Sequence, residues 1–272
     1  MAEVTGKKGL WLYCIIENKE PKAFDCPGIH GDGPVFVVEG GEFAALVSEE
    51  PMKKYQLVRD TLIAHQKVNE VALQTHRVLP VRFCTMTDKK EKIVDEVLVP
   101  KATEFRDKLG EIAGCDEHGL RVRWKDIDKI FKQIGDADEK VREKKQKILS
   151  LPENQRHNEL IDIGHLVQEA IQAKNAETAK SIVAALSPLS ANVKKNNTLG
   201  DAMVLNAAFL VRSRDQEKFD RKVDELDGLY GSDLQLKYIG PVPPFNFVEI
   251  VIKWKEEPTG EAKKGAEHVS DR

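Results

Sequence analysis

The chain has 272 residues, of which 41% are hydrophobic and 32% are charged, and its formal net charge is −3. This composition is typical of globular domains and excludes a disordered chain, and the nearly balanced charge gives no overall attraction to nucleic acid or anionic lipid. The length exceeds that of one average domain, so we expect two domains.

The N-terminal apolar run GLWLYCIIE, residues 9–17, is too short to cross a membrane and ends in Glu17. The segment before it lacks the small-residue cleavage site of a secretory signal. We therefore interpret 9–17 as the first strand of a cytoplasmic protein that does not enter a membrane. The four cysteines form no CxxC pair, which indicates reduced thiols that mostly fill the core; they are Cys14, Cys26, Cys84 and Cys115.

The N-terminal half alternates short apolar runs with turn residues. Two apolar runs flank Gly40-Gly41, a dipeptide suited to a two-residue hairpin turn. Apolar residues at helical spacing then follow; they are Tyr55, Val58, Leu62, Val68 and Val71. In chain order the sequence predicts strands at 9–17, 35–39 and 42–48, a helix at 53–76, a strand at 77–86 and a helix at 89–113. This order matches a ferredoxin-like βαββαβ unit whose first helix is replaced by a loop.

The C-terminal half repeats the order β, α, β, β, α, β. Its first helix is expanded into helical segments over 127–186, which are interrupted near Gly135 and Pro152. The other predicted elements are strands at 119–126, 189–195, 202–213 and 234–240 and a helix at 215–229. The sequence therefore predicts a second ferredoxin-like domain that carries a long helical arm.

The expected fold class is α+β, with three regions along the chain. These are a modified ferredoxin-like domain at 1–116, an α+β domain with its helical arm at 117–256, and a disordered tail at 257–272. The tail is predicted because the sequence after Trp254 has no apolar periodicity. The mixed-sign arm surface is typical of a solvated helix face, with a partner-binding patch as the alternative.

Motifs for catalysis or cofactor binding are absent from the sequence. The glycines of GIHGDGP, residues 28–34, precede a strand and so cannot place a helix N-terminus against a phosphate. Along a predicted helix, His65 and His76 would lie roughly 16 Å apart, too far to share a metal. The same argument excludes His157 with His165. We expect no catalytic residue, no metal and no cofactor, and hence no enzyme.

Two alternatives stay open beside this interpretation. An active site assembled from scattered residues leaves no local motif, so a small-molecule enzyme is one alternative. A ferredoxin-like sheet also binds RNA in some proteins, through aromatic residues in a conserved strand motif. That motif does not occur here, and the isolated Phe36 and Phe209 are typical of core residues.

The stretch HRVLPVRFCTM, residues 76–86, places an arginine inside an apolar strand. Pro80 cannot donate to a strand ladder, which favours a sheet edge or a bulge. Burial of an unpaired guanidinium is costly, so we expect Arg82 to be buried and paired, tying this strand to its neighbours. The alternative is that Arg82 belongs to a partner-binding surface.

Two stretches resemble the gas vesicle protein GvpL/GvpF family, over about residues 9–252. That family typically has LPVRFGT where this chain has LPVRFCT, and a Gly-Pro-x-Pro-Pro-aromatic-x-Phe-Val segment where this chain has GPVPPFNFV. The chain departs from the family pattern at Cys84, where glycine is usual, at Val242, where a larger residue is frequent, and at Phe245, where tyrosine is common.

The resemblance implies a noncatalytic assembly factor or minor structural component of gas vesicles, located in the cytoplasm and at the vesicle. Its implied partners are the small hydrophobic shell protein GvpA and other accessory Gvp proteins, with neither nucleic acid nor membrane. The candidate partner-binding or structural residues are Leu79, Pro80, Arg82 and Phe83 in the first motif and Pro241, Pro243, Pro244, Phe245 and Phe247 in the second.

The second motif has two interpretations. Its prolines either stiffen an extended connection that Phe245 and Phe247 anchor to a core, or they form an exposed proline and aromatic docking surface.

Overall fold

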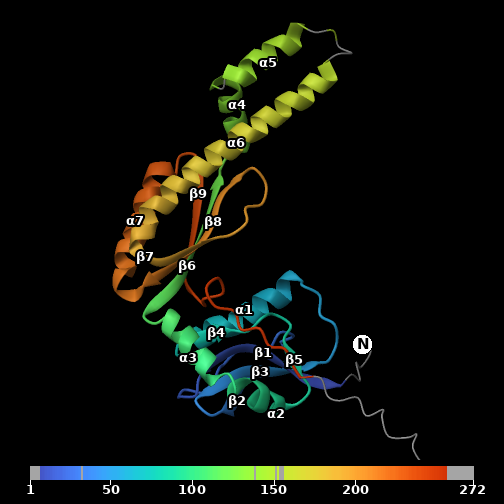
Figure 1. Ribbon diagram of the computed structural model, residues 1–272, viewed down its shortest axis with the longest axis vertical. Coiled ribbons are helices and arrows are strands. Elements are labelled where there is room, and N and C mark those ends of the chain that lie inside the picture. Colours follow the sequence, from blue (N-terminus) through green and yellow to red (C-terminus); the bar gives the residue numbers. More distant parts are fainter. Residues whose placement is uncertain (1–6, 32, 138, 151, 153–155, 256–272) are drawn as a thin grey trace, which may run out of the picture. The chain divides into compact units, whose positions relative to one another are not determined.

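The computed structural model describes residues 7–31, 33–137, 139–150, 152 and 156–255, and its chain forms two compact units (Figure 1). Of these described residues, the first unit contains those up to 68, those at 81–103 and those at 250–255; the second contains those at 69–80 and 104–249. This division differs from the expected one at residue 117, because 69–80 and 104–116 belong to the second unit and 250–255 belong to the first. Arg77 Nη1 donates to the Cys115 carbonyl at 2.5 Å and to Asp116 Oδ1 at 2.9 Å. The predicted tail at 257–272 lies outside the described residues.

The first unit is built on an antiparallel sheet. Its strands β1 (Lys8–Glu17), β2 (Phe36–Gly40) and β3 (Phe43–Pro51) follow the order β2-β3-β1, and β5 (Met86–Thr87) also pairs with β1. The predicted hairpin joins β2 to β3, but its two turn residues are Gly41-Glu42 rather than Gly40-Gly41, and Gly41 has the positive φ, 69°, that such a turn needs. β1 is buried along almost its whole length, which explains its continuous apolar sequence.

Helix α1 (Arg59–Leu73) is shorter than predicted and presents a different stripe. Its buried positions include His65, Val68 and Ala72, whereas Val58 and Leu62 are 46% and 39% exposed. The predicted burial of the first part of this stripe is therefore wrong: the periodicity continues, but no core covers its N-terminal end among the described residues.

The single strand predicted at 77–86 is also wrong. Strand β4 is only Val78–Pro80, and the chain then turns, with the Thr85 hydroxyl donating to the Arg82 carbonyl at 2.6 Å. Arg82 is exposed in this turn, so the expectation of a buried guanidinium is corrected.

The helix predicted at 89–113 consists of three pieces. They are α2 (Lys90–Ile93), the π-helical η1 (Val94–Leu98) and α3 (Ala102–Glu111). The break before α3 follows from Pro100, which has no backbone N–H to continue the helical hydrogen bonds.

The second unit has the connectivity that the sequence predicted. Its antiparallel strands β6 (Cys115–Trp124), β7 (Ser190–Lys195), β8 (Met203–Arg212) and β9 (Leu234–Val242) follow the order β7-β8-β6-β9. Helices α6 (Arg156–Leu186) and α7 (Gln216–Tyr230) pack on this sheet (Figure 1). Between them lies a continuous apolar core in which Phe209 of β8 contacts Phe219 of α7, with ring centres 5.3 Å apart.

The helical arm comprises α4 (Ile127–Ala137), α5 (Glu139–Ser150) and the N-terminal part of α6. Short 3-10 turns, η3 (Ser187–Leu189) and η4 (Ser213–Asp215), follow α6 and precede α7. The interruptions predicted near Gly135 and Pro152 lie close to the ends of α4 and α5. Across the described residues, no helix combines the length and the apolar character needed to cross a bilayer.

Candidate partner-binding site

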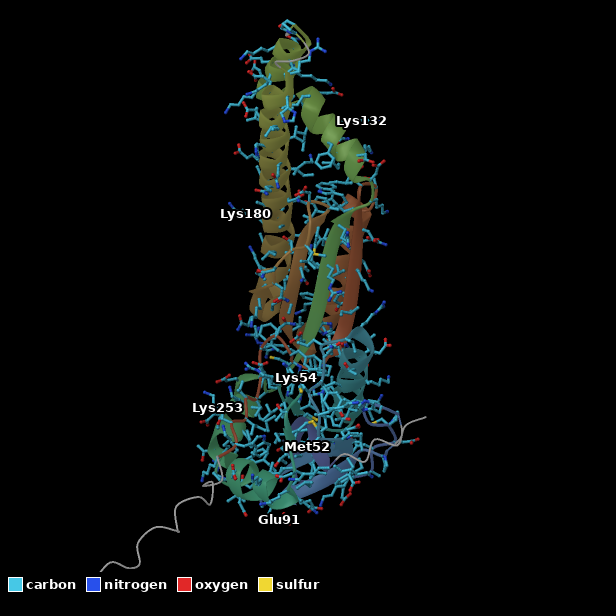
Figure 2. All side chains as sticks on the ribbon, turned by 90° about the vertical axis from the view of Figure 1, so that its right-hand side faces the viewer. Met52, Lys54, Glu91, Lys132, Lys180 and Lys253 are labelled. Carbon is cyan, nitrogen blue, oxygen red and sulfur yellow. The ribbon has the colours of Figure 1, made fainter. Side chains whose placement is uncertain are left out.

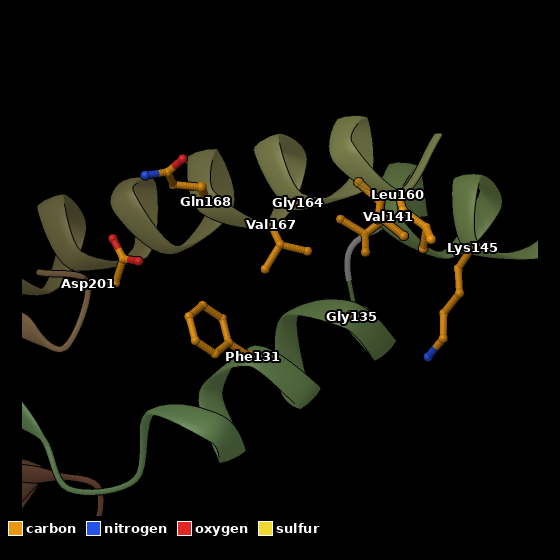
Figure 3. A pocket seen from close by; sticks show the side chains of 10 residues that line it. Phe131, Gly135, Val141, Lys145, Leu160, Gly164, Val167, Gln168 and Asp201 are labelled. Carbon is orange, nitrogen blue, oxygen red and sulfur yellow. The ribbon is translucent and has the colours of Figure 1, made fainter. Parts of the chain in front are cut away.

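An open groove of about 620 Å³ runs between the helices of the arm (Figure 3). Its lining comes from α4, α5, α6 and the loop before β8, and most of it is apolar. The lining residues are Phe131, Gly135, Val141, Lys145, Leu160, Ile163, Gly164, Val167, Gln168 and Asp201. A concave apolar surface of this kind suits apolar side chains better than a small polar substrate.

The walls of the groove are formed by side chains from facing helices. Phe131 of α4 and Val167 of α6 point toward one another across it (Figure 3). Two of its lining positions are glycines, Gly135 and Gly164, and a Cβ built on either would meet no other atom within 4 Å. The groove is therefore open at both glycines, and small residues leave room there for an inserted side chain.

Ion pairs hold α5 against α6 at one end of the groove. Lys144 Nζ lies 2.6 Å from Asp162 and 3.2 Å from Glu159, and Lys147 Nζ lies 3.1 Å from Glu159. Hydrogen bonding to Lys144 lowers the pKa of Asp162, and the two carboxylates raise the pKa of Lys144. Such exposed pairs add little to the free energy of unfolding, but several together fix how the two helices align.

At the other end of the groove, the side-chain amide of Asn175 joins α6 to β6 and to the loop before β8. Trp124 Nε1 donates to Asn175 Oδ1 at 2.6 Å, and Asn175 Nδ2 donates to the Asp201 carbonyl at 2.8 Å. Asp201 is thereby placed at one end of the groove and Lys145 lies at the other (Figure 3). The apolar centre has opposite charges at its two ends, which favours an elongated ligand such as a helix.

The first sequence motif does not line this groove. Leu79 and Pro80 are buried in β4, Arg82 is exposed, and Phe83 is half-buried. Phe83 packs edge-on against Trp11, with ring centres 5.1 Å apart. The backbone N–H of Arg82 donates to the Ile250 carbonyl at 3.0 Å. These residues are therefore divided between buried and exposed positions rather than brought together around one pocket.

The second motif begins at the end of β9 and continues into a compact turn. Pro243 and Pro244 are buried, Phe245 and Phe247 are half-buried, and Pro241 is exposed. The backbone N–H groups of Phe247 and Val248 both donate to the Pro244 carbonyl, at 3.0 and 2.8 Å. The segment thus turns directly after its prolines instead of continuing as an extended chain.

Sequence reasoning missed the polar contact that holds this turn. Glu117 of β6 is buried and accepts two hydrogen bonds from Asn246, one from the backbone N–H and one from Nδ2. Lys194 Nζ donates to the Asn246 carbonyl at 2.9 Å, and Asn196 Nδ2 donates to Asn246 Oδ1 at 2.9 Å. Because the paired residues are far apart in the chain, no local pattern marks them.

The histidines and carboxylates do not assemble a metal site in the part of the chain that the structure describes. No three side chains of the types His, Cys, Asp and Glu come together there as a metal ion requires. His65, a candidate weighed from the sequence, instead bonds Trp11 and the backbone.

The model of the family "Gas vesicle synthesis protein GvpL/GvpF" matches residues 9–249 of the chain. Gas vesicle protein F of Nostoc sp. is 26% identical over 248 residues, which cover 89% of this chain and 98% of that protein. Gas vesicle protein L1 of Halobacterium salinarum is 23% identical and covers 90% and 92%. The crystal structure of gas vesicle protein GvpF from Anabaena sp. is similar, with a TM-score of 0.76 and 25% identity over 89% of this chain and 99% of that one.

Proposed function

The chain belongs to the gas vesicle GvpL/GvpF family, and from this we propose that it is a noncatalytic factor that binds the small hydrophobic shell protein GvpA during gas vesicle assembly. It would also contact other accessory Gvp proteins, first in the cytoplasm and then at the vesicle. The observation that carries the proposal is the apolar groove of the helical arm.

The physical need for such a factor comes from the shell protein itself. A small hydrophobic subunit exposes apolar surface before it polymerises, and exposed apolar surface leads to aggregation. A groove with an apolar centre can take the apolar face of a helix from that subunit, as in other helix-in-groove complexes. Lys145 and Asp201, at opposite ends, would then fix the direction in which the helix lies.

The two sequence motifs do not line the groove, so we assign them other roles in this proposal. The burial of Leu79, Pro80, Pro243 and Pro244 supports a structural role for them. The exposure of Arg82 instead supports a role at the surface, where it would contact a partner.

The proposal is tested by co-expressing the chain with tagged shell protein and measuring how much is retained on the tag. Leu160→Glu places a charge in the groove, and it should fold normally because Leu160 is already 54% exposed. We expect retention to fall about tenfold, since a buried charge without a partner weakens a docked interface strongly.

Ile161→Glu is the matched control. Ile161 directly follows Leu160 on the same helix, is 49% exposed and does not line the groove. Its variant should retain shell protein within about twofold of the unmodified chain. Equal losses for both variants, or no loss for either, would show that the groove is not the docking site. No retention of the unmodified chain would refute shell-protein binding itself.

A further inference from the structure

A second surface, in the first unit, is both apolar and basic. Of eleven large hydrophobic side chains that are well exposed in the described residues, five lie between residues 52 and 63. They are Met52, Leu57, Val58, Leu62 and Ile63, and Leu57 is 74% exposed. Single exposed hydrophobic residues are ordinary, but such a concentration in twelve residues indicates a contact surface. We call this segment the basic apolar surface.

Two apolar residues of this surface, Val58 and Leu62, lie on one side of the start of α1. The Leu62 N–H donates to the Val58 carbonyl at 3.2 Å, so these two side chains are one turn apart on the same side. The same stripe continues into the buried His65 and Ala72 further along α1. Val58 and Leu62, the first two residues of this stripe, are therefore apolar like core residues but lie at the surface.

The same segment of the chain carries three cations. Lys53, Lys54 and Arg59 are all exposed, and Asp60 is the one carboxylate of the segment. None of the three cations forms an ion pair with a carboxylate within the described ranges. Lys53 Nζ instead lies 5.1 Å from the centre of the Tyr55 ring. Met52 and Lys54 are labelled in Figure 2. The positive charge is local, because the whole chain carries a net charge of −3.

We propose that the basic apolar surface docks an acidic amphipathic helix of a partner protein. Apolar side chains of such a helix would cover Leu57, Val58 and Ile63, while carboxylates beside them would meet Lys53, Lys54 and Arg59. Complementary charge is the argument for this occupant: the segment holds five exposed apolar side chains and three cations that form no ion pair within the described ranges, and these match a helix whose apolar stripe is flanked by Asp or Glu. The surface lies in the other unit from the groove, and the inference does not depend on the proposed function.

The position of Tyr55 argues for a protein partner over a lipid surface. Interfacial membrane segments place aromatic side chains at the boundary between water and lipid. Here Tyr55 turns inward: its ring packs edge-on against Trp11 at 4.9 Å, and its hydroxyl donates to the Pro51 carbonyl at 3.0 Å. The exposed side chains are aliphatic, as in a helix-binding surface.

The test uses two synthetic peptides of about 18 residues with leucines at helical spacing. In one peptide glutamates flank the leucines, and in the other lysines replace those glutamates. Fluorescence anisotropy with the full chain should show the acidic peptide binding at least about tenfold more tightly, with affinity falling as salt rises. Leu57→Asp and the double variant Lys53→Glu/Lys54→Glu should each weaken that binding by about tenfold.

Two variants in the second unit serve as controls. Leu229→Asp changes a side chain that is 69% exposed on α7, and Lys132→Glu/Lys180→Glu, labelled in Figure 2, makes the same change of charge. Both should bind the acidic peptide normally. All variants change exposed residues, and their melting temperatures should match the unmodified chain.

Three outcomes would overturn the proposal. The first is equal binding, or no binding, of the two peptides. The second is binding to vesicles with about 30% phosphatidylglycerol that Leu57→Asp abolishes, without binding of the acidic peptide, which would assign the surface to lipid. The third is a dimer of this chain that Leu57→Asp dissociates in sedimentation, which would assign the surface to a second copy.

Discussion

Glu117 and Asn246 form a two-point contact between the first strand of the second sheet and the turn after its last strand. The backbone N–H of Asn246 donates to Glu117 Oε2 at 2.9 Å, and Asn246 Nδ2 donates to Oε1 at 2.6 Å. Burial raises the pKa of Glu117, and its two hydrogen bonds with Asn246 act in the opposite direction. The carboxylate is therefore costly to bury, and Asn246 offsets part of that cost.

Asn246→Ala should lower the free energy of unfolding by roughly 2 to 3 kcal/mol, because it leaves a buried carboxylate with one donor fewer. Urea denaturation at neutral pH measures the change. Asn197→Ala, which changes an exposed asparagine in the same unit, should stay within about 0.5 kcal/mol of the unmodified chain. Similar losses for the two variants would mean that the contact adds nothing specific.

The loss in Asn246→Ala should also depend on pH. A carboxyl whose folded pKa is raised binds its proton more tightly in the folded state, so its contribution to stability falls as pH rises from the unfolded pKa through the folded one. Removing Asn246 raises the folded pKa further. The variant should therefore be destabilised less in mildly acidic buffer than at neutral pH, and a loss that is constant with pH would contradict this account of Glu117.

His65 should make the first unit sensitive to acid. The Trp11 indole donates to His65 Nδ1 at 3.0 Å, which fixes Nε2 as the protonated nitrogen that donates to the Val81 carbonyl at 3.2 Å. The ring is thus held neutral, and burial lowers its pKa from 6.5 to about 4. Because the unfolded chain binds the extra proton, stability is lost as pH falls through this window, by about 2 kcal/mol between pH 7 and pH 5.

His65→Gln isolates this effect. Glutamine keeps an acceptor and a donor but does not titrate between pH 5 and pH 7. Unfolding measured at both pH values should show a smaller loss on acidification for the variant, whatever its absolute stability. The prediction fails if the unmodified chain and the variant lose the same free energy.

Cys84→Gly should stabilise the chain. Cys84 has φ 66°, in the left-handed region where a Cβ is strained and glycine is not. The related family usually has glycine at this position, and the backbone conformation gives the physical reason. We expect a gain of about 1 kcal/mol in the free energy of unfolding. Cys84→Ala removes the same thiol but keeps the strain, so a comparable gain in that variant would show that the thiol, and not the backbone, is responsible.

Gly28→Ala should disturb a buried series of hydrogen bonds in the first unit. The Ile29 N–H donates to the Tyr13 hydroxyl, Tyr13 donates to Ser48 Oγ, and Ser48 donates to Glu50 Oε1, over 2.9, 2.7 and 2.8 Å. Glu50 Oε2 then meets His30 Nδ1 at 2.7 Å.

A Cβ at Gly28 would lie 2.7 Å from both Ser48 Oγ and Glu50 Oε1, so these groups would have to move. We expect a loss of roughly 2 kcal/mol, visible as a lower melting temperature. Gly33→Ala, in the same loop, is the control, because its Cβ would approach nothing closer than 3.9 Å. A melting temperature that falls equally in both variants would point to lost loop flexibility instead.

The sequence by itself determined the features that depend on neighbouring residues. Apolar runs on either side of Gly40-Gly41 predicted the first hairpin, an acidic first turn predicted the helix at 215–229, which is α7, and the order of elements predicted the second sheet's connectivity. Turn chemistry and periodicity are local properties, so they can be read from short stretches. The two motifs similarly indicated the family, because each is a contiguous run of residues.

Only the tertiary structure decided which of these residues are covered. Arg82 and Leu62 follow patterns that predict burial, yet both are exposed, whereas Glu117 is polar and buried. The groove of the arm likewise depends on how α4, α5 and α6 pack, and the stripe of α1 depends on where its core ends. Burial depends on contacts between segments that are distant in the chain. A pattern of neighbouring residues contains no information about those contacts.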